Sequence, residues 1–387
     1  MQIILIGNYK PDRQESMERF TMMLESGFRK AGFNVEIWRP SVYFGALTKS
    51  TVSGLGKWLG YIDKWILFPG SIRWRLLFSP SNAAAFYHIC DHSNAPYLQH
   101  LPLEQTGITC HDVLAIRGAF GEPDAYCKAS AFGYYYQKWI LKHLSNSKRI
   151  AVVSEQTLSQ LKKLVQHKAP FPNQWQVIYN AFNNEFKPRE MNGCSEVLPK
   201  VGINSDVPYI LHVGSSLPRK NRKLLVDMVV ALGERWMGNI CYAGEAADEE
   251  LELYIRKMKL QDRVFFVVKP DHSTLVALYS TCEAFVFPSF SEGFGWPVIE
   301  AQACGAPVIA SNIEPMPEVS GGTALHASPS NPQQFADAFL SLTNEVKRAE
   351  VIRRGFANAA RFRNEQMVEA YLELYGLANP KPNLHVV

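Results

Sequence analysis

The stretch Phe285–Ser311, which reads FVFPSFSEGFGWPVIEAQACGAPVIAS, constrains the fold of this chain more than any other segment. An apolar β-type run ends at Pro288 and is followed by a loop that contains glycine. A helical pattern begins near Pro297, a residue suited to a first helical position, and ends at Gly305 before a second apolar run. Two such runs joined by a helix predict parallel strands with a crossover helix, and therefore an α/β fold.

The same alternation of apolar runs and helical patterns recurs along the chain in two series. We predict strands at Ile3–Ile6, Val35–Trp38, Ala85–Ile89, Gly107–Cys110 and Arg149–Val153, and then at Tyr209–Val213, Asn239–Ala243, Val264–Val268, Ala284–Pro288 and Pro307–Ala310. Because 387 residues exceed what one hydrophobic core usually serves, the two series predict two α/β domains.

The segment between the two series has no sustained periodicity and is rich in proline and glycine. That composition is typical of a linker, so we expect a first domain at 1–186, a linker at 187–207 and a second domain at 208–364. The remaining segment, 365–387, contains a helical stripe of apolar residues that must be buried against another part of the chain. The stripe consists of Met367, Ala370, Tyr371, Leu374 and Tyr375.

Composition excludes several other classes of protein. With 47% hydrophobic and 20% charged residues, the chain is typical of a packed globular protein, and a net charge of +4 is too dilute to indicate nucleic-acid binding. Seven cysteines without a Cys-x-x-Cys pair argue against a disulfide framework or a zinc ribbon. No apolar run reaches the roughly 18 residues that span a bilayer, and Met1–Gly7 is predicted to be a strand and not a signal peptide. We therefore expect a cytoplasmic protein, either soluble or peripheral to a membrane.

The glycine loop predicts an anion site, because it lies at the carboxyl end of a strand and at a helix start. Unpaired amides around Trp296–Ile299 would face a phosphate. Glu292 precedes the glycines and Glu300 falls in the first helical turn, and carboxylates suit the hydroxyls of a hexose and of a ribose. The alternative is a glycine turn in which Glu300 only balances the helix dipole.

Two other predicted strands end in polar residues. Arg219 and Lys220 follow Tyr209–Val213, and two cations there would neutralise a diphosphate leaving group, unless they form only a solvated face. His111 follows Gly107–Cys110, where an imidazole would hydrogen-bond a sugar hydroxyl or polarise the reacting group, unless it is an ordinary loop histidine.

Together these motifs resemble the family-4 retaining glycosyltransferases of the GT-B fold. EGFGWPVIE matches the family's E-x7-E signature, and the supporting matches are LHVGSSLPRKN, VIYNAF, AVVSEQTLSQL, TCHD and the terminal FRNEQMVEAYLELYG. The resemblance covers nearly the full chain. It implies two Rossmann-like, doubly wound domains facing across a cleft, with the last helix crossing back to the first domain.

The resemblance also implies a function. The second domain would hold a nucleotide-diphosphate sugar, and the first domain would hold a saccharide or lipid-linked acceptor. The transferred hexose would be mannose, glucose or rhamnose, in cell-surface polysaccharide assembly, with no metal or other cofactor. Same-face attack would retain the anomeric configuration, with the departing phosphate serving as the base.

Individual roles carry over by position. The expected catalytic residues are His111, Lys220 and Glu292; the phosphate would contact Arg219, Lys220 and Val298; the sugar would contact Glu292, Gly293, Phe294 and Gly295; and the ribose would contact Glu300. This chain departs from many relatives at Gln14–Met17, where they have two glycines, and at Ser215, where they have arginine. The first departure puts the phosphate role of that loop in doubt, and the second shifts the phosphate charge to Arg219 and Lys220.

Residues 56–78 place Lys57, Trp58, Tyr61, Lys64, Trp65, Arg73, Trp74 and Arg75 among leucines and isoleucines. Cations beside tryptophans suit the surface of an anionic membrane, but an amphipathic helix that covers the core would show the same pattern. His88, Asp91 and His92 have the residue types of a metal site, although the segment offers no fixed third ligand.

Two rival functions remain open, a nucleotide-sugar epimerase of the same architecture and a non-catalytic scaffold that binds sugar nucleotides. The joint presence of Lys220, Glu292 and Glu300 argues against the scaffold. A dehydrogenase is disfavoured because Gly-x-Gly-x-x-Gly does not follow the first strand.

Overall fold

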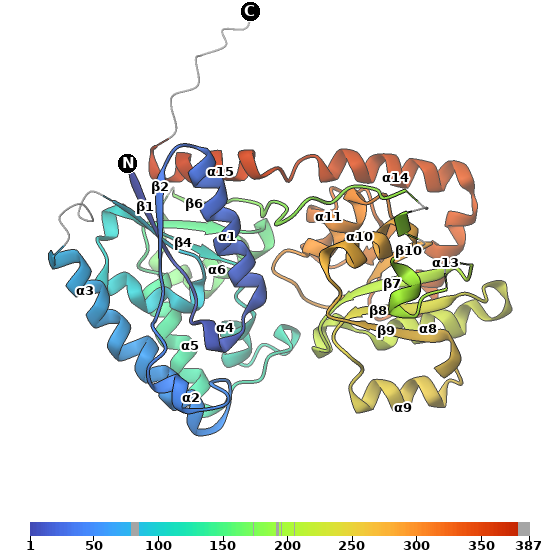
Figure 1. The fold of residues 1–387 in the computed structure, drawn as a ribbon, viewed down its shortest axis with the longest axis horizontal. Coiled ribbons are helices and arrows are strands. Elements are labelled where there is room, and N and C mark those ends of the chain that lie inside the picture. Colours follow the sequence, from blue (N-terminus) through green and yellow to red (C-terminus); the bar gives the residue numbers. More distant parts are fainter. Residues whose placement is uncertain (79–84, 173, 191–192, 195, 205, 378–387) are drawn as a thin grey trace, which may run out of the picture. The chain divides into compact units, whose positions relative to one another are not determined.

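The structure is a computed structural model that describes residues 1–78, 85–172, 174–190, 193–194, 196–204 and 206–377. The chain divides into two compact units (Figure 1). The first unit contains Met1–Glu122, Cys127–Asn183 and Asn364–Val387, and the second contains Pro123–Tyr126 and Asn184–Arg363. Each unit has a parallel six-stranded sheet, so the predicted α/β class is confirmed.

The first sheet has the strand order β2-β1-β3-β4-β5-β6. The strands are β1 (Gln2–Ile6), β2 (Asn34–Trp38), β3 (Phe86–Ile89), β4 (Thr106–Cys110), β5 (Arg149–Val152) and β6 (Trp175–Val177). The main helices are α1 (Glu15–Lys30), α2 (Gly54–Ile62), the π-helix Asp63–Leu67, α3 (Phe68–Phe78), α4 (Leu114–Ala119), α5 (Ala131–Leu144), α6 (Glu155–Leu164) and α15 (Asn364–Tyr375). After β2 the chain returns past β1 to β3, so the loops after β1 and β3 diverge at a topological switch point.

The second sheet has the strand order β12-β11-β10-β7-β8-β9. The strands are β7 (Tyr209–Gly214), β8 (Asn239–Gly244), β9 (Val264–Val268), β10 (Ala284–Phe287), β11 (Val308–Ser311) and β12 (Leu325–Ala327). The main helices are α8 (Lys223–Leu232), α9 (Glu249–Lys257), α10 (His272–Thr281), α11 (Trp296–Ala303), α12 (Met316–Val319), α13 (Pro332–Leu340) and α14 (Glu345–Ala359). Here the switch point lies between β7 and β10.

The core of the second unit lies on both faces of its sheet because side chains alternate along each strand. On β10, Phe285 and Phe287 pack with residues of α10 and α11, whereas Val286 packs with α8 and α13 on the opposite face. Such two-sided burial explains the uninterrupted apolar runs in the sequence.

The terminal helix α15 packs on the first unit and buries the apolar stripe. Tyr371 donates to or accepts from Thr109 at 2.7 Å, and His88 bonds Thr109 at 2.8 Å through Nε2 and Tyr375 through Nδ1. All four side chains are buried. His88 therefore fastens a helix to the sheet. No group of three or more potential metal ligands occurs among the residues that the structure describes.

The segment expected to be a linker, 187–207, lies in the second unit. Cys194, Leu198 and Ile203 are buried there and pack with Tyr209 and Leu278 in the core. The division along the chain falls instead between Asn183 and Asn184, and again between Arg363 and Asn364. Proline and glycine mark turns in this segment, but its few apolar residues are enough to anchor it.

Candidate functional site

Two loops meet at the switch point of the second unit, one after β7 and one after β10. The side chain of Asn221 joins them by donating to the carbonyl of Pro288 at 3.1 Å. The amide of Phe290 also donates to the carbonyl of Arg219 at 2.8 Å. Asn221 has a φ of 53°, a left-handed conformation that asparagine tolerates better than most residues. The backbone thus holds the predicted residues of both loops next to each other.

Three of the predicted site residues form one ion-paired cluster. Glu292 accepts from Lys220 Nζ at 2.6 Å through one carboxylate oxygen and from Arg219 Nη1 at 2.5 Å through the other. The Lys220 ammonium also lies 5.0 Å from the ring centroid of Phe287, within range of a cation–π contact. Only 8% of the Glu292 side chain and 11% of the Lys220 side chain are exposed.

The charges in this cluster do not balance. Burial alone would raise the pKa of Glu292, but Lys220 and Arg219 hold it below its usual value. Burial lowers the pKa of Lys220, and Glu292 opposes that effect. One carboxylate between two cations leaves a net positive charge, which is the electrostatic condition for binding an anion.

His212 on β7 lies beside this cluster and was not predicted. Its Nδ1 bonds the carbonyl of Val286 at 3.1 Å, so Nδ1 must carry the proton and Nε2 is an acceptor. Nε2 is buried and has no partner among the described residues. Burial lowers the pKa of His212 to about 3, so the ring is neutral at physiological pH. The motif LHVG contains this histidine, but only the sheet shows which way it faces.

Glu300 is buried on α11 and held by a residue that sequence reasoning missed. Tyr279 on α10 donates its hydroxyl to Glu300 at 3.0 Å. Burial and the nearby carboxylate raise the pKa of Tyr279, which keeps it a donor. Because α11 begins at Trp296, Glu300 lies in its second turn and not in the predicted first turn.

One of the amides expected to be unpaired at the start of α11 has a partner. The amide of Val298 donates to the carbonyl of Gly295 at 3.0 Å, so it is already used by the turn. Gly295 has a φ of 106°, and a Cβ there would lie 2.6 Å from Met316 Cε, so a larger residue would disturb the loop. Phe294 is buried, with its ring against Phe362. Gly293 lies between Phe294 and Glu292 in the chain.

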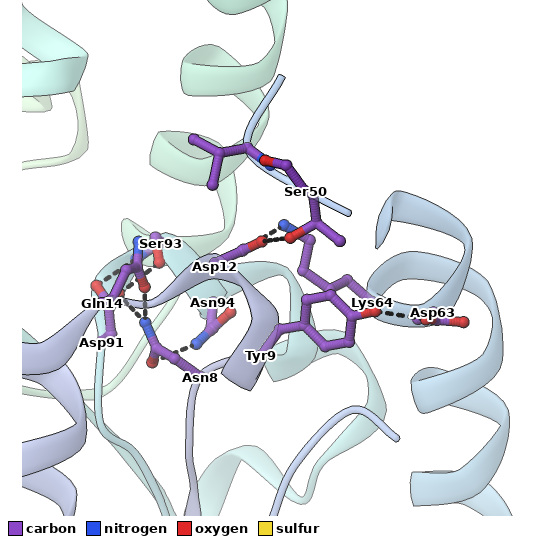
Figure 2. A network of polar contacts seen from close by, with 12 residues as sticks. Asn8, Tyr9, Asp12, Gln14, Ser50, Asp63, Lys64, Asp91, Ser93 and Asn94 are labelled. Carbon is purple, nitrogen blue, oxygen red and sulfur yellow. Dashed lines mark hydrogen bonds and ion pairs between the residues drawn. The ribbon is translucent and has the colours of Figure 1, made fainter. Parts of the chain in front are cut away.

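The first unit has a cavity of about 500 Å³, here called the polar pocket, at the carboxyl ends of β1, β3 and β4. Figure 2 shows the network along one side of it. Asn8 donates to Asp91 at 2.6 Å and to Gln14, and accepts from Asn94 at 2.9 Å. Asp91 also accepts from the amide of Ser93 at 2.9 Å. The polar pocket thus lies at the switch point of the first sheet.

A second part of the network involves Asp12 and Lys64 (Figure 2). Lys64 Nζ donates to Asp12 at 2.7 Å and lies 4.8 Å from the ring centroid of Tyr61. Thr51 donates to the same carboxylate at 2.9 Å. Lys64 is buried, so this residue fits the alternative of a segment that covers the core. Its partner Asp12 comes from the distant loop after β1.

His111 lies in the first unit and lines the polar pocket, whereas the other predicted site residues lie in the second unit. Its Nε2 bonds the carbonyl of Cys90 at 2.9 Å, so Nε2 donates and Nδ1 is left as an acceptor. Burial lowers the pKa of His111, although Asp91 opposes the shift, and the imidazole is therefore neutral at physiological pH.

The segment 54–78 both covers the core and exposes apolar side chains. Phe68 and Ile72 are buried in the first core, and the ring of Trp65 lies 5.0 Å from that of Tyr97. On the outer side, large apolar residues are more than half exposed: Leu55, Trp58, Ile66, Trp74, Leu77 and Phe78. None of the helices in the described ranges is long and apolar enough to span a membrane.

Comparisons with known proteins agree with this architecture. Sucrose-phosphate synthase from Thermosynechococcus elongatus matches with a TM-score of 0.72 and 19% identity, over 97% of this chain and 98% of that one. HepE of Anabaena, solved in complex with UDP and glucose, matches with a TM-score of 0.70 and 15% identity, over 97% and 99% of the two chains. At these identities the likeness concerns the fold, which is the GT-B fold of glycosyltransferases.

Residues 195–358 match the family described as glycosyl transferases group 1. The O-antigen chain mannosyltransferase B of Escherichia coli is 28% identical over 286 residues, which cover 73% of this chain and 72% of that protein. The chain is therefore similar to group 1 glycosyltransferases in the sequence of 195–358 and to one O-antigen mannosyltransferase over most of its length.

Proposed function

We propose that this protein is a retaining glycosyltransferase of family 4 that transfers a hexose from a nucleotide-diphosphate sugar to a saccharide or lipid-linked acceptor. The observation that carries the proposal is the cluster of Arg219, Lys220 and Glu292, which has a net positive charge at the switch point of the second unit. Such a site suits a diphosphate, because its cations can follow the charge that develops as the phosphate departs.

In this mechanism the diphosphate oxygens replace Glu292 as partners of Lys220 and Arg219. The released carboxylate of Glu292 then accepts hydrogen bonds from hydroxyls of the donor sugar, next to the backbone of Gly293–Gly295. Glu300, held by Tyr279, binds the two ribose hydroxyls. Binding therefore exchanges one set of charge-assisted bonds for another.

The acceptor sugar occupies the polar pocket in this proposal, and Nδ1 of His111 accepts a hydrogen bond from a substrate hydroxyl. The acceptor oxygen forms a bond to the anomeric carbon on the face from which the phosphate leaves. The bond between that carbon and the phosphate oxygen breaks, and the departing phosphate takes the acceptor's proton. The side chains of Arg219 and Lys220 neutralise the charge of the departing phosphate in this mechanism. We therefore propose that transfer requires no metal and persists with a chelator present.

The name of the E. coli relative favours mannose as the transferred hexose, in the assembly of a surface polysaccharide. The UDP and glucose bound by HepE favour a nucleotide donor for this fold. The seven cysteines, all free thiols, favour a reducing cytoplasm.

The test is a thermal-shift screen of nucleotide-diphosphate sugars, followed by proton NMR of the product's anomeric configuration. A stabilising donor and a product with the donor's configuration are expected. A product of inverted configuration would overturn the retaining mechanism. Conversion of the donor sugar to an epimer without any acceptor would instead support the epimerase.

We also propose that the outer side of 56–78 docks on an anionic membrane surface. Exposed apolar residues such as Trp58 and Trp74 lie beside the exposed cations Lys57 and Arg73, as an interfacial segment requires. Sedimentation with liposomes containing phosphatidylglycerol should deplete the protein from solution, and a Trp58→Ser/Trp74→Ser variant should stay in solution. Equal behaviour with and without liposomes would remove this proposal.

A further inference from the structure

The polar pocket continues into a second cavity of about 320 Å³, here called the distal groove. The two cavities share five of their lining residues: Lys57, Tyr61, Ala115, Tyr136 and Gln137. The rest of the distal groove is lined by the segment 127–130 and the first residues of α5. A ligand that fills the polar pocket therefore has space to extend along the first unit.

One wall of the distal groove is a stack of three aromatic rings. Phe132 stacks on Tyr61 at a centroid distance of 5.9 Å and on Tyr136 at 6.1 Å, and Tyr61 lies 5.6 Å from Tyr136. The interplanar angles are 28°, 15° and 19°, so the rings are nearly parallel. Mutual packing fixes their orientation, which makes this wall a preformed surface for a ligand.

The charges in the distal groove have one sign. Lys57 and Lys128 line it, and no aspartate or glutamate does. Among the described residues, neither lysine forms an ion pair with a carboxylate. In contrast, the carboxylates of the polar pocket have partners, since Asp12 pairs with Lys64 and Asp91 accepts from Asn8. Two positive charges in a cavity without a counter-charge favour an anionic ligand.

We infer that the distal groove binds a phosphate group carried by the acceptor. This inference rests on the proposed function: the sugar that receives the hexose occupies the polar pocket, and a phosphate or pyrophosphate on the same molecule lies between Lys57 and Lys128. The phosphate belongs either to a soluble glycosyl phosphate or to a lipid-linked saccharide. In the second case the exposed Trp58, whose ring contacts Phe132 at 4.9 Å, lies beside the start of the lipid.

The experiment compares three acceptors: methyl α-mannoside, mannose 1-phosphate and mannose linked through pyrophosphate to a short prenyl chain. Each is titrated with the wild type, with Lys57→Ala/Lys128→Ala, and with Lys138→Ala as a matched control on the outer part of α5 and outside the groove. Calorimetric binding and KM for transfer are both measured. Equal thermal midpoints show that the variants are folded.

We expect the two phosphate-bearing acceptors to bind about tenfold more tightly than the neutral glycoside. The double variant should lose that difference, Lys138→Ala should keep it, and Lys57→Arg/Lys128→Arg should restore most of it. A preference for the prenyl-linked acceptor over mannose 1-phosphate identifies the lipid as the source of the phosphate. Equal affinity for neutral and phosphorylated acceptors would overturn the inference, as would a loss that is the same for all three.

The experiment also distinguishes a failure of this inference from a failure of the proposed function. If wild-type protein transfers the hexose to the neutral glycoside as well as to the phosphates, the glycosyltransferase stands and the groove's role is wrong. If no acceptor is glycosylated, the proposed function fails, and the calorimetric difference between wild type and the double variant still decides whether the groove binds phosphate.

Discussion

Glu292 already pairs with Arg219 and Lys220, the two cations proposed to bind a diphosphate. Its two carboxylate oxygens bond Arg219 and Lys220, so the proposed binding of a diphosphate to these cations would replace both bonds. In the proposed mechanism Glu292 therefore lowers the affinity of the site for a free nucleotide and, once released, binds the sugar. This dual role follows from the geometry of one side chain.

Glu292→Gln should separate the two effects. The amide keeps the shape but removes the negative charge, so a free nucleoside diphosphate should bind roughly tenfold more tightly, whereas transfer should fall by roughly two orders of magnitude. Calorimetry measures the first effect and product formation the second. Weaker nucleotide binding by a folded variant would show that Glu292 does not compete for these cations.

Tyr279 should act through Glu300. Without its hydroxyl, Glu300 loses a donor and its fixed orientation, so Tyr279→Phe should weaken donor binding about tenfold. The loss should disappear with a 2′,3′-dideoxynucleotide sugar, which lacks the ribose hydroxyls. A loss of the same size with both nucleotides would mean that Tyr279 has only a structural role.

At the residue scale, the sequence indicated which side chains lie near each other where both follow a predicted strand end, although their roles stay predictions. The cluster of Lys220 and Glu292 was expected in one crevice, and the structure brings the two side chains to 2.6 Å. Tyr279, His212 and Asp12 were missed as partners. His212 lies within β7 and Tyr279 within α10, where the sequence does not show which neighbour a side chain faces, and Asp12 meets a lysine of a later helical segment.

At the scale of elements, α15 packs closely against the rest of the first unit at positions where the facing residue is a glycine and has no side chain. A Cβ at Gly107 would lie 2.8 Å from Tyr375 Oη, and a Cβ at Gly27 would lie 2.3 Å from a methyl group of Val368. Gly70, in α3, has nothing within 4 Å of its Cβ position. Gly27 and Gly107 therefore have no room for a larger side chain, whereas Gly70 has.

Gly27→Ala and Gly107→Ala should each destabilise the first unit by about 1–3 kcal/mol, because overpacking displaces α15. Gly70→Ala should be neutral or stabilise it by about 0.5–1 kcal/mol, since it only raises helix propensity. Urea unfolding of the three variants measures the free energies. If all three behave alike, close packing of α15 does not depend on these positions.

Most strands were predictable because their apolar runs are long and sit on both faces of a buried sheet. The edge strands β6 and β12 were not predicted, since each has only three residues and too little sequence to form a pattern. The segment 187–207 shows the opposite problem: turn residues dominate its composition, while Leu198 and Ile203 anchor it in the core.

At the scale of the whole molecule, each unit contains a fully buried histidine whose pKa is strongly lowered. Burial lowers the pKa of His88 in the first unit and of His212 in the second to about 3. The unfolded chain takes up these protons near pH 6.5, whereas the folded chain does not until about pH 3. Below pH 6.5 the unfolded state therefore binds more protons, and stability falls as the pH falls.

Each unit should lose roughly 2 kcal/mol of stability between pH 7.5 and pH 5 from its buried histidine. Denaturant unfolding at both pH values measures the change, and His88→Gln should reduce the pH dependence of the first unit only. Stability that is unchanged or higher at pH 5 would contradict the neutral, buried state of these rings.

The most direct test of the account is transfer of the hexose by Lys220→Ala, with Lys223→Ala as the matched control. Lys223 lies three residues further on, at the start of α8, and pairs with Glu250 on the surface. We predict that Lys220→Ala loses at least about a hundredfold in transfer and binds free nucleoside diphosphate more weakly, while Lys223→Ala behaves as wild type. Equal transfer by the two variants would contradict the central claim that Lys220 holds the departing diphosphate.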